Sequence, residues 1–255
     1  MTVVAVLADP PREGLVLPAL SGSPLLSEEE AAGLYEAALK DVVRAVAGSG
    51  GDPLVNYRSA DSLPDGHGNA DPEQRLRSVV EDALDDLRGA DAGEVRYEVQ
   101  VGSTLVARVG NTVTHLLREE GADSAAVCWP TAPLMARTEV DSAAMKLRGS
   151  PVVLGPATGG RVYYAGFTEP IDFEGALAPP AVETLVARGV DEGYDADFLP
   201  TVPRIDTTEA LASTVSIVRA RRRAGRRVPE FTAAAIEALD LVVREGDGAA
   251  IVARE

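Results

Sequence analysis

Two short loops contain the residue types that bind phosphate groups. The first loop spans Asp9 to Gly14 and follows an apolar run, and the second spans Leu154 to Arg161. Glycines let an anion approach backbone N–H groups, and a guanidinium group supplies positive charge. The candidate phosphate-binding residues of the two loops are Pro11, Arg12, Gly14, Gly155, Gly159, Gly160 and Arg161. An ordinary surface loop is favoured for the first segment, whereas a hairpin turn and a ligand loop are equally favoured for the second.

A third candidate is the carboxylate of Asp206, which directly precedes a predicted helix. This side chain could cap that helix, or it could bind a hard divalent cation. Capping is favoured when the residue is considered alone. The histidines, His67 and His115, lack the spacing of metal ligands, and Cys128 is the single cysteine, so a zinc site is not expected.

The charge of the chain restricts its partners. There are 40 acidic residues against 24 Lys and Arg, which gives a net charge of −16. Such a surface repels nucleic-acid phosphates, so no nucleic-acid partner is expected. The arginine-rich segment from Arg219 to Arg227 is the exception. It ends a predicted helix, where cations complement the helix dipole, and we expect it to pair with carboxylates or to contact a second subunit of a homo-oligomer.

Apolar runs alternate with helical patterns along the chain. The expected strands are 3–8, 53–57, 94–100, 124–129, 152–154, 162–166, a strand ending near 199–200, and 249–252. The expected helices are 27–48, 72–87, 105–119, 140–147, 181–190, 208–223 and 230–243. This alternation predicts an α/β fold with a mainly parallel, mixed sheet and helices on both faces. No long linker divides the chain, so one domain covering residues 1–255 is expected.

The hydropathy pattern argues against a membrane protein. No apolar run approaches the roughly 20 residues that a membrane span needs. The first residues, Met1 to Ala8, lack the basic segment of a signal peptide. The sequence therefore predicts a cytoplasmic protein without a membrane partner.

Several segments, taken in chain order, resemble one family. These segments are Pro11–Gly14, Glu30–Tyr35, Gln100–Arg108, Val153–Ala157, Tyr163–Gly166 and Ile205–Leu211. Together they are similar to glycosyltransferase-like proteins of GT-A (nucleotide-diphospho-sugar transferase) fold related to 2-phospho-L-lactate guanylyltransferase. The resemblance implies this fold, a nucleotide or nucleotide-sugar partner, and a reaction in which an acceptor attacks a nucleotide-activated donor. It also implies that the two loops of candidate residues bind the nucleotide.

The chain departs from the family where the chemistry should occur. The family's Lys-Thr-Arg phosphate grip corresponds to the uncharged segment from Leu17 to Ala19, and Thr131 stands where the family has a metal-binding Asp. The resemblance leaves Asp206 as the metal carboxylate, so Mg²⁺ or Mn²⁺ would be held weakly. Asp9 is the nearest other acid by its position at a strand end. The alternative function is therefore a degenerate, non-catalytic subunit for binding or assembly.

The charge balance predicts that stability depends on salt. The net charge is −16, and the sequence contains two lysines, Lys40 and Lys146. Salt at about 1 M reduces the screening length to about 3 Å, which relieves repulsion between carboxylates, as in the cytoplasm of a halophile. We expect the melting temperature, followed by circular dichroism, to rise markedly from dilute buffer to molar KCl. An unchanged melting temperature would contradict the halophilic interpretation.

Overall fold

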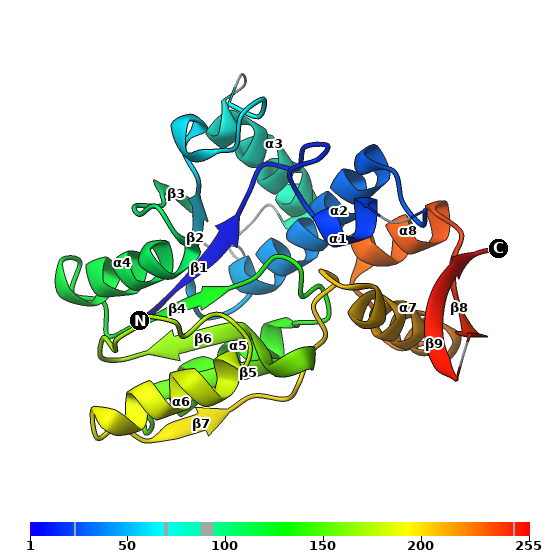
Figure 1. Ribbon diagram of the computed structural model, residues 1–255. Coiled ribbons are helices and arrows are strands. Elements are labelled where there is room, and N and C mark those ends of the chain that lie inside the picture. Colours follow the sequence, from blue (N-terminus) through cyan, green and yellow to red (C-terminus); the bar gives the residue numbers. More distant parts are fainter. Residues whose placement is uncertain (23, 69–70, 88–93, 247) are drawn as a thin grey trace.

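The apolar run near the start of the chain forms strand β1 (Thr2–Ala8), which is buried along its whole length. In the computed structural model, which describes residues 1–22, 24–68, 71–87, 94–246 and 248–255, β1 lies in the middle of a sheet (Figure 1). Parallel neighbours flank it on both sides, β2 (Asp52–Tyr57) and β4 (Ser124–Cys128). Alternate residues of β1 therefore enter two different hydrophobic cores, as the continuous apolar run predicts.

The sheet has seven strands in the order β3-β2-β1-β4-β6-β5-β7. The remaining strands are β3 (Arg96–Val99), β5 (Val152–Ala157), β6 (Arg161–Phe167) and β7 (Ala196–Phe198), of which β3 and β7 lie at the edges. Strand β6 runs antiparallel to β4 and β5, while the other pairings are parallel. The predicted α/β class, the mainly parallel sheet and the antiparallel strand pair after Val152 are thus confirmed.

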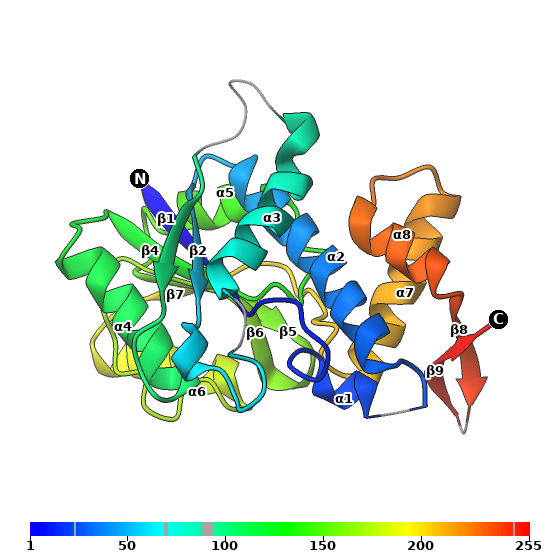
Figure 2. The ribbon, with the colours of Figure 1, turned by 90° about the horizontal axis from the view of Figure 1, so that it is seen from above.

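Helices cover both faces of the sheet, as Figure 2 shows with the sheet seen from its edge. One face packs against α4 (Leu105–Arg118) and α6 (Ala181–Asp191), and the other against α2 (Glu28–Ala47), α3 (Pro72–Leu84) and α5 (Arg137–Lys146). Ser27 begins α2 with a capping box, as its sequence predicts. Among the residues that the structure describes, no helix has the length and apolar character that a membrane span requires.

The chain after the sheet departs from the prediction at one point. Helix α7 (Thr208–Arg223) matches its expected bounds, but α8 (Glu230–Ala238) ends earlier than the predicted limit of Val243. Asp240 has a left-handed φ of 50°, which breaks the helix, and the following segment forms β8 (Leu241–Gly246). Strand β8 pairs with β9 (Ala249–Arg254) in a separate two-stranded sheet. The β-branched residues after Asp240 favour this hairpin over continued helix.

The remaining elements are short. They are helix α1 (Pro18–Ser21) and the 3₁₀ turns η1 (Ala60–Ser62), η2 (Asp85–Leu87) and η3 (Thr158–Gly160). Helix α1 lies in the loop after β1, and η3 forms the tip of the β5–β6 hairpin. Pro18, the first residue of α1, lines the candidate site described below.

A buried carboxylate joins α8 to α2. Asp41 of α2 accepts hydrogen bonds from the backbone N–H groups of Phe231 (3.2 Å) and Thr232 (2.7 Å) in the first turn of α8. Burial raises the pKa of Asp41 to about 6, although these hydrogen bonds act in the opposite direction. Ionisation of Asp41 therefore lowers the free energy of unfolding, because burial disfavours the charged form.

This raised pKa predicts the sign of a pH effect. A carboxyl whose pKa is higher in the folded state stabilises the fold while it is protonated, and it loses that contribution as the pH rises towards 6. Asp41→Asn carries no charge to bury. The unfolding free energy of the variant minus that of the wild type should therefore increase by about 2 kcal/mol between about pH 4 and about pH 7.

Urea unfolding at a series of pH values measures this difference. Asp191→Asn, at the exposed end of α6, is the control for the removal of one negative charge. A difference for Asp41→Asn that stays constant over the pH range would contradict the assignment.

Candidate functional site

A hollow of about 290 Å³ lies at the carboxyl ends of the central strands. The chain crosses from β1 to β2 on one side of β1 and later reaches β4 on the other side, so the strand order reverses here. Ligands of open α/β sheets bind at such a switch point. We call it the strand-end hollow and define it by its charged lining residues, Asp9, Arg58, Arg108, Arg204 and Asp206.

The strand-end hollow is positively charged. Its lining has three guanidinium groups against two carboxylates, which leaves an excess of one positive charge. The whole chain has a net charge of −16, so this local excess runs against the composition. A concave site with fixed positive charge attracts anions. The charge of the hollow therefore favours an anionic ligand.

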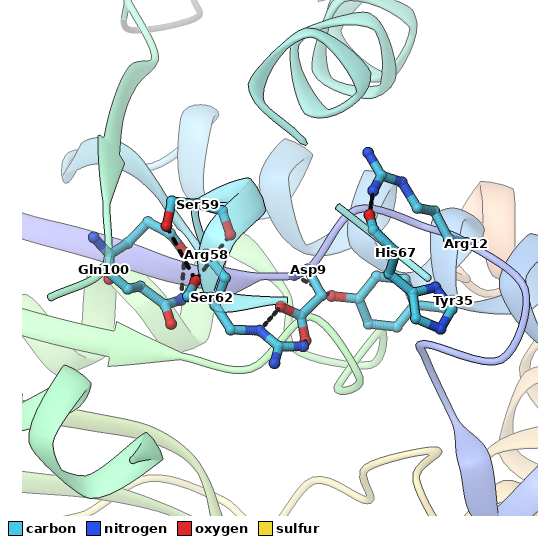
Figure 3. Close-up of polar contacts among 9 residues, drawn as sticks. Asp9, Arg12, Tyr35, Arg58, Ser59, Ser62, His67 and Gln100 are labelled. Carbon is cyan, nitrogen blue, oxygen red and sulfur yellow. Dashed lines mark hydrogen bonds and ion pairs between the residues drawn. The ribbon is translucent and has the colours of Figure 1, made fainter. Parts of the chain in front are cut away.

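Asp9 and Arg58 form one wall of the hollow (Figure 3). The guanidinium group of Arg58 donates from Nε to Oδ1 of Asp9 at 2.5 Å and from Nη2 to Oδ2 at 2.7 Å. The backbone N–H of Asp9 donates to the hydroxyl of Tyr35 at 2.9 Å. Burial raises the pKa of Tyr35 well above its ordinary value, so this phenol stays neutral. Both carboxylate oxygens of Asp9 are thus engaged by one arginine.

Arg204 also lines the hollow, and its side chain is 14% exposed. It donates from Nε to Oγ1 of Thr131 (3.2 Å) and from Nη1 to the carbonyl of Val162 (2.9 Å). Its Nη2 lies 2.6 Å from Oδ2 of Asp206, and its guanidinium carbon lies 5.0 Å from the centre of the Trp129 ring. Burial lowers the pKa of Arg204, while the charge of Asp206 opposes this shift. The group is held in one orientation by contacts on several sides.

Arg108, near the start of α4, is the third guanidinium group of the hollow. Its Nε is buried and has no hydrogen-bond partner, and no carboxylate of the described residues pairs with it. Burial lowers the pKa of Arg108, and the neighbouring charge of Arg58 adds to this shift. A buried donor without an acceptor is unfavourable, and a bound anion would supply the missing acceptor.

A buried network of amide groups positions two of these arginines. Gln100, which follows β3, donates from Nε2 to the backbone carbonyl of Asn56 at 2.7 Å. The side-chain oxygen of Asn56 accepts a hydrogen bond of 2.9 Å from the hydroxyl of Thr112 on α4. The network ties β2 and the segment after β3 to α4. It therefore fixes the elements that carry Arg58 and Arg108.

The first predicted loop divides between two hollows. Arg12 donates to the carbonyl of His67, and Figure 3 shows it extending away from Asp9 and Arg58. With Pro11 it lines another hollow, which several glutamates surround. Gly14 has a φ of +70° and forms the turn after Arg12. The segment that directly follows this loop, 15–18, supplies the apolar wall of the strand-end hollow.

The second predicted loop forms the β5–β6 hairpin. Ala157 pairs with Arg161, and Gly159 and Gly160 turn the chain with φ values of +72° and +70°. Such angles suit glycine, which has no Cβ. Arg161 lies beside the strand-end hollow, with its Nη1 3.8 Å from Oδ1 of Asp206. Of the residues predicted from the sequence, Arg161 and Asp206 are brought together.

Sequence reasoning missed Arg58, Arg108 and Arg204 as site residues. Arg58 directly follows β2 and Gln100 directly follows β3, so both stand at carboxyl ends of parallel strands. That position was the available signal, because such strand ends converge on the ligand crevice. Arg108 belongs to the segment from Gln100 that carries part of the family resemblance. No local spacing marks Arg204, whose contact with Thr131 joins residues 73 positions apart.

The donors in the strand-end hollow do not fit a divalent cation. Mg²⁺ and Mn²⁺ need carboxylate oxygens that are not already neutralised. Both oxygens of Asp9 accept from Arg58, and Oδ2 of Asp206 accepts from Arg204. The hydroxyl of Thr131 also accepts from Arg204. Oδ1 of Asp206 is the one oxygen of these two carboxylates that accepts no hydrogen bond from the described residues. A metal ion would therefore find a single free carboxylate oxygen here, with Arg161 Nη1 at 3.8 Å and Arg204 on the other oxygen.

A carboxylate and histidine cluster does occur elsewhere. Ligand atoms of Glu98, His115 and Glu120 lie within 4.8 Å of one another. This cluster involves the last turn of α4, whereas Arg108 enters the strand-end hollow from near the start of that helix. Arg96 forms ion pairs with Glu98 (3.1 Å) and with Glu120 (2.8 Å), so an arginine already neutralises both acids.

Comparison with known proteins shows the fold. No protein-family model matches the chain, and no curated protein sequence matches it. Its structure resembles a candidate nucleotide-diphospho-sugar transferase of Desulfovibrio desulfuricans with a TM-score of 0.73 and 18% identity, over 93% of this chain and 96% of the other. A cytidylyltransferase of Leptospira borgpetersenii matches with a TM-score of 0.49 and 12% identity, over 93% of this chain and 94% of the other. The first likeness establishes a fold of the nucleotide-diphospho-sugar transferase type.

The geometry of Gly155 leads to a prediction about stability. A Cβ at this position would lie 2.6 Å from Cζ of Tyr163, whose ring is fully buried. Gly155→Ala should therefore lower the unfolding free energy by about 1–3 kcal/mol, as overpacking of a core does. Gly33→Ala is the matched control, because its Cβ would meet nothing within 4 Å on α2. A fully stable Gly155→Ala variant that binds phosphate ligands less well would instead support a ligand role.

Proposed function

We propose that the chain is a nucleotide-sugar or nucleotidyl transferase-like protein that binds the phosphate groups of its donor in the strand-end hollow. The observation that carries this proposal is the excess of positive charge at the switch point of the sheet, in a chain of net charge −16. The unpartnered Nε of Arg108 supports it, because an anion would satisfy this donor. The fold of the nucleotide-diphospho-sugar transferase type is consistent with a nucleotide ligand.

Arginine side chains suit this chemistry. A guanidinium group donates two parallel hydrogen bonds to phosphate oxygens, and its charge persists at all ordinary pH values. When an acceptor attacks a nucleotide-activated donor, negative charge develops on the phosphate that leaves. Arg58, Arg108 and Arg204 converge from three segments on one hollow and would stabilise that charge.

The apolar wall of the hollow provides a place for the rest of the ligand. Leu15, Val16 and Leu17 are apolar lining residues of the hollow. Leu17 adopts a left-handed conformation with a φ of 48°, and α1 begins directly after it. Binding sites for small molecules combine such apolar surface with a few polar groups. We propose that this wall contacts the nucleobase or the sugar.

A non-catalytic binding or assembly subunit is the second candidate function. Asp9 and Asp206 are the carboxylates among the lining residues of the hollow, and both are engaged with guanidinium groups. A carboxylate held in this way is poorly suited to accept a proton from an attacking hydroxyl. On this second interpretation the hollow binds a nucleotide without transferring any part of it. Turnover of a bound donor, followed by product analysis, separates the two functions.

The proposed function predicts the effect of Arg108→Ala. Calorimetric titration with GTP, CTP, UTP and a UDP-sugar should identify at least one ligand of the wild type. The variant should bind that ligand about tenfold or more weakly, because a hydrogen bond to a charged group contributes about 1.5–3 kcal/mol. Its fold should be unchanged, since the buried Nε of Arg108 has no hydrogen-bond partner to lose within the described chain and alanine keeps the backbone hydrogen bond to Thr104.

Two further variants make the test specific. Arg148→Ala removes one exposed positive charge far from the lining residues and should bind as the wild type does. Arg12→Ala tests the phosphate-binding role that the sequence predicts for the first loop, since Arg12 lines a different hollow. A loss of affinity in Arg12→Ala together with normal affinity in Arg108→Ala would move the phosphate site to the first loop and contradict the proposal.

A further inference from the structure

Arg204 lies between two residues from different parts of the fold. Thr131 follows β4, whereas Asp206 precedes α7, and Arg204 donates to the side chain of each. The backbone reinforces this junction, because the N–H of Ile205 donates to the carbonyl of Thr131 at 2.7 Å. The guanidinium group is therefore part of the framework that closes the hollow at this side.

The surroundings of Arg204 fix a positive charge in place. The guanidinium group has a side-chain hydroxyl, a backbone carbonyl, a carboxylate and the Trp129 ring around it. Only Asp206 among these partners carries a full negative charge in direct contact. Thr131 and the carbonyl of Val162 accept hydrogen bonds without neutralising charge. Asp9, the other carboxylate of the hollow, is already paired with Arg58.

A divalent cation beside Asp206 would meet this fixed charge. Oδ2 of Asp206 lies 2.6 Å from Nη2 of Arg204, and Oδ1 lies 3.8 Å from Nη1 of Arg161. Oδ1 is buried and accepts no hydrogen bond from the described residues. A metal ion at Oδ1 would lie close to the guanidinium group of Arg161, and Arg204 on the other oxygen of the same carboxylate adds to the repulsion.

We propose that Arg204 is the resident cation of the strand-end hollow, and that this chain binds the diphosphate part of its ligand as the free anion, without a divalent metal. The inference rests on the proposed function and specifies the ionic form of the ligand. Arg58 and Arg108 are the other two cations among its lining residues. A metal complex of a nucleotide carries less negative charge than the free nucleotide, so the positive hollow should attract it less strongly.

The test uses inorganic pyrophosphate and the full chain. Calorimetric titrations are made in EDTA and in excess MgCl₂ at equal ionic strength. We expect binding in EDTA that is at least as tight as binding in MgCl₂. Arg204→Ala should weaken binding in EDTA by about tenfold or more, since it removes a charge-assisted hydrogen-bonding group. Arg148→Ala again controls for the loss of one positive charge.

Asp206→Asn provides a second test that does not remove a buried arginine. Asparagine keeps an acceptor for Arg204 but removes a negative charge from the hollow. If Arg204 serves as the resident cation, pyrophosphate should bind this variant severalfold more tightly in EDTA. If Asp206 is a metal ligand, the variant should lose affinity in MgCl₂. This comparison distinguishes the two roles of Asp206 even if Arg204→Ala fails to fold. Circular dichroism shows whether Arg204→Ala is folded.

The outcomes separate the inference from the proposed function. Pyrophosphate binding that needs Mg²⁺ and is lost in Asp206→Asn would overturn the inference and leave nucleotide binding intact. Direct binding of Mn²⁺ to the wild type that is lost in Asp206→Asn, measured by electron paramagnetic resonance, would overturn it in the same way. The absence of binding of pyrophosphate and of the nucleotide panel in both buffers would contradict the proposed function, and the inference would fall with it.

Discussion

The reversal of strand order at β1 is the constraint on which the rest of the structure depends. Because the chain leaves β1 towards β2 and later reaches β4 on the opposite side, neither crossover covers the carboxyl end of β1. Segments after β1, β2, β3 and β4 therefore meet at one edge of the sheet and line one hollow. Their loops need not share any local motif. Each one has only to place a side chain of the right type at a strand end.

The charge of the strand-end hollow depends on which of its arginines are paired with carboxylates. In a chain of net charge −16, an isolated arginine would readily find a carboxylate partner, and many surface arginines do so. The hollow differs because its carboxylates, Asp9 and Asp206, are fewer than its arginines. The carboxylates orient Arg58 and Arg204, while Arg108 keeps a buried Nε without an acceptor. The excess positive charge of the hollow is therefore that of Arg108, the guanidinium group without a carboxylate partner among the described residues, and such a charge attracts anions.

Local sequence signals predicted the fold better than the site. The buried strand β1 and the capped helix α2 follow from runs of apolar residues and from the Ser27 cap, which are properties of neighbouring positions. The predicted helix continues past the end of α8, because the sequence pattern does not indicate the left-handed backbone conformation of Asp240. The site depends on pairs far apart in the chain, such as Asp9 with Arg58, 49 positions away. The composition of the loop from Leu154 to Arg161 made Gly155 a candidate phosphate-binding residue. In the structure, the ring of Tyr163 packs against Gly155 and explains the glycine.

The proposed role of Arg204 also accounts for the pair Thr131 and Asp206. A buried guanidinium group needs one counter-charge, because burial disfavours its ionised form, and Asp206 supplies it at 2.6 Å. A second carboxylate at position 131 would neutralise the remaining positive charge of the hollow and oppose an anionic ligand. The hydroxyl of Thr131 instead orients Nε of Arg204 without adding charge. Threonine at this position and aspartate at 206 are therefore consistent with a site that holds an arginine where a two-carboxylate site would hold a metal ion.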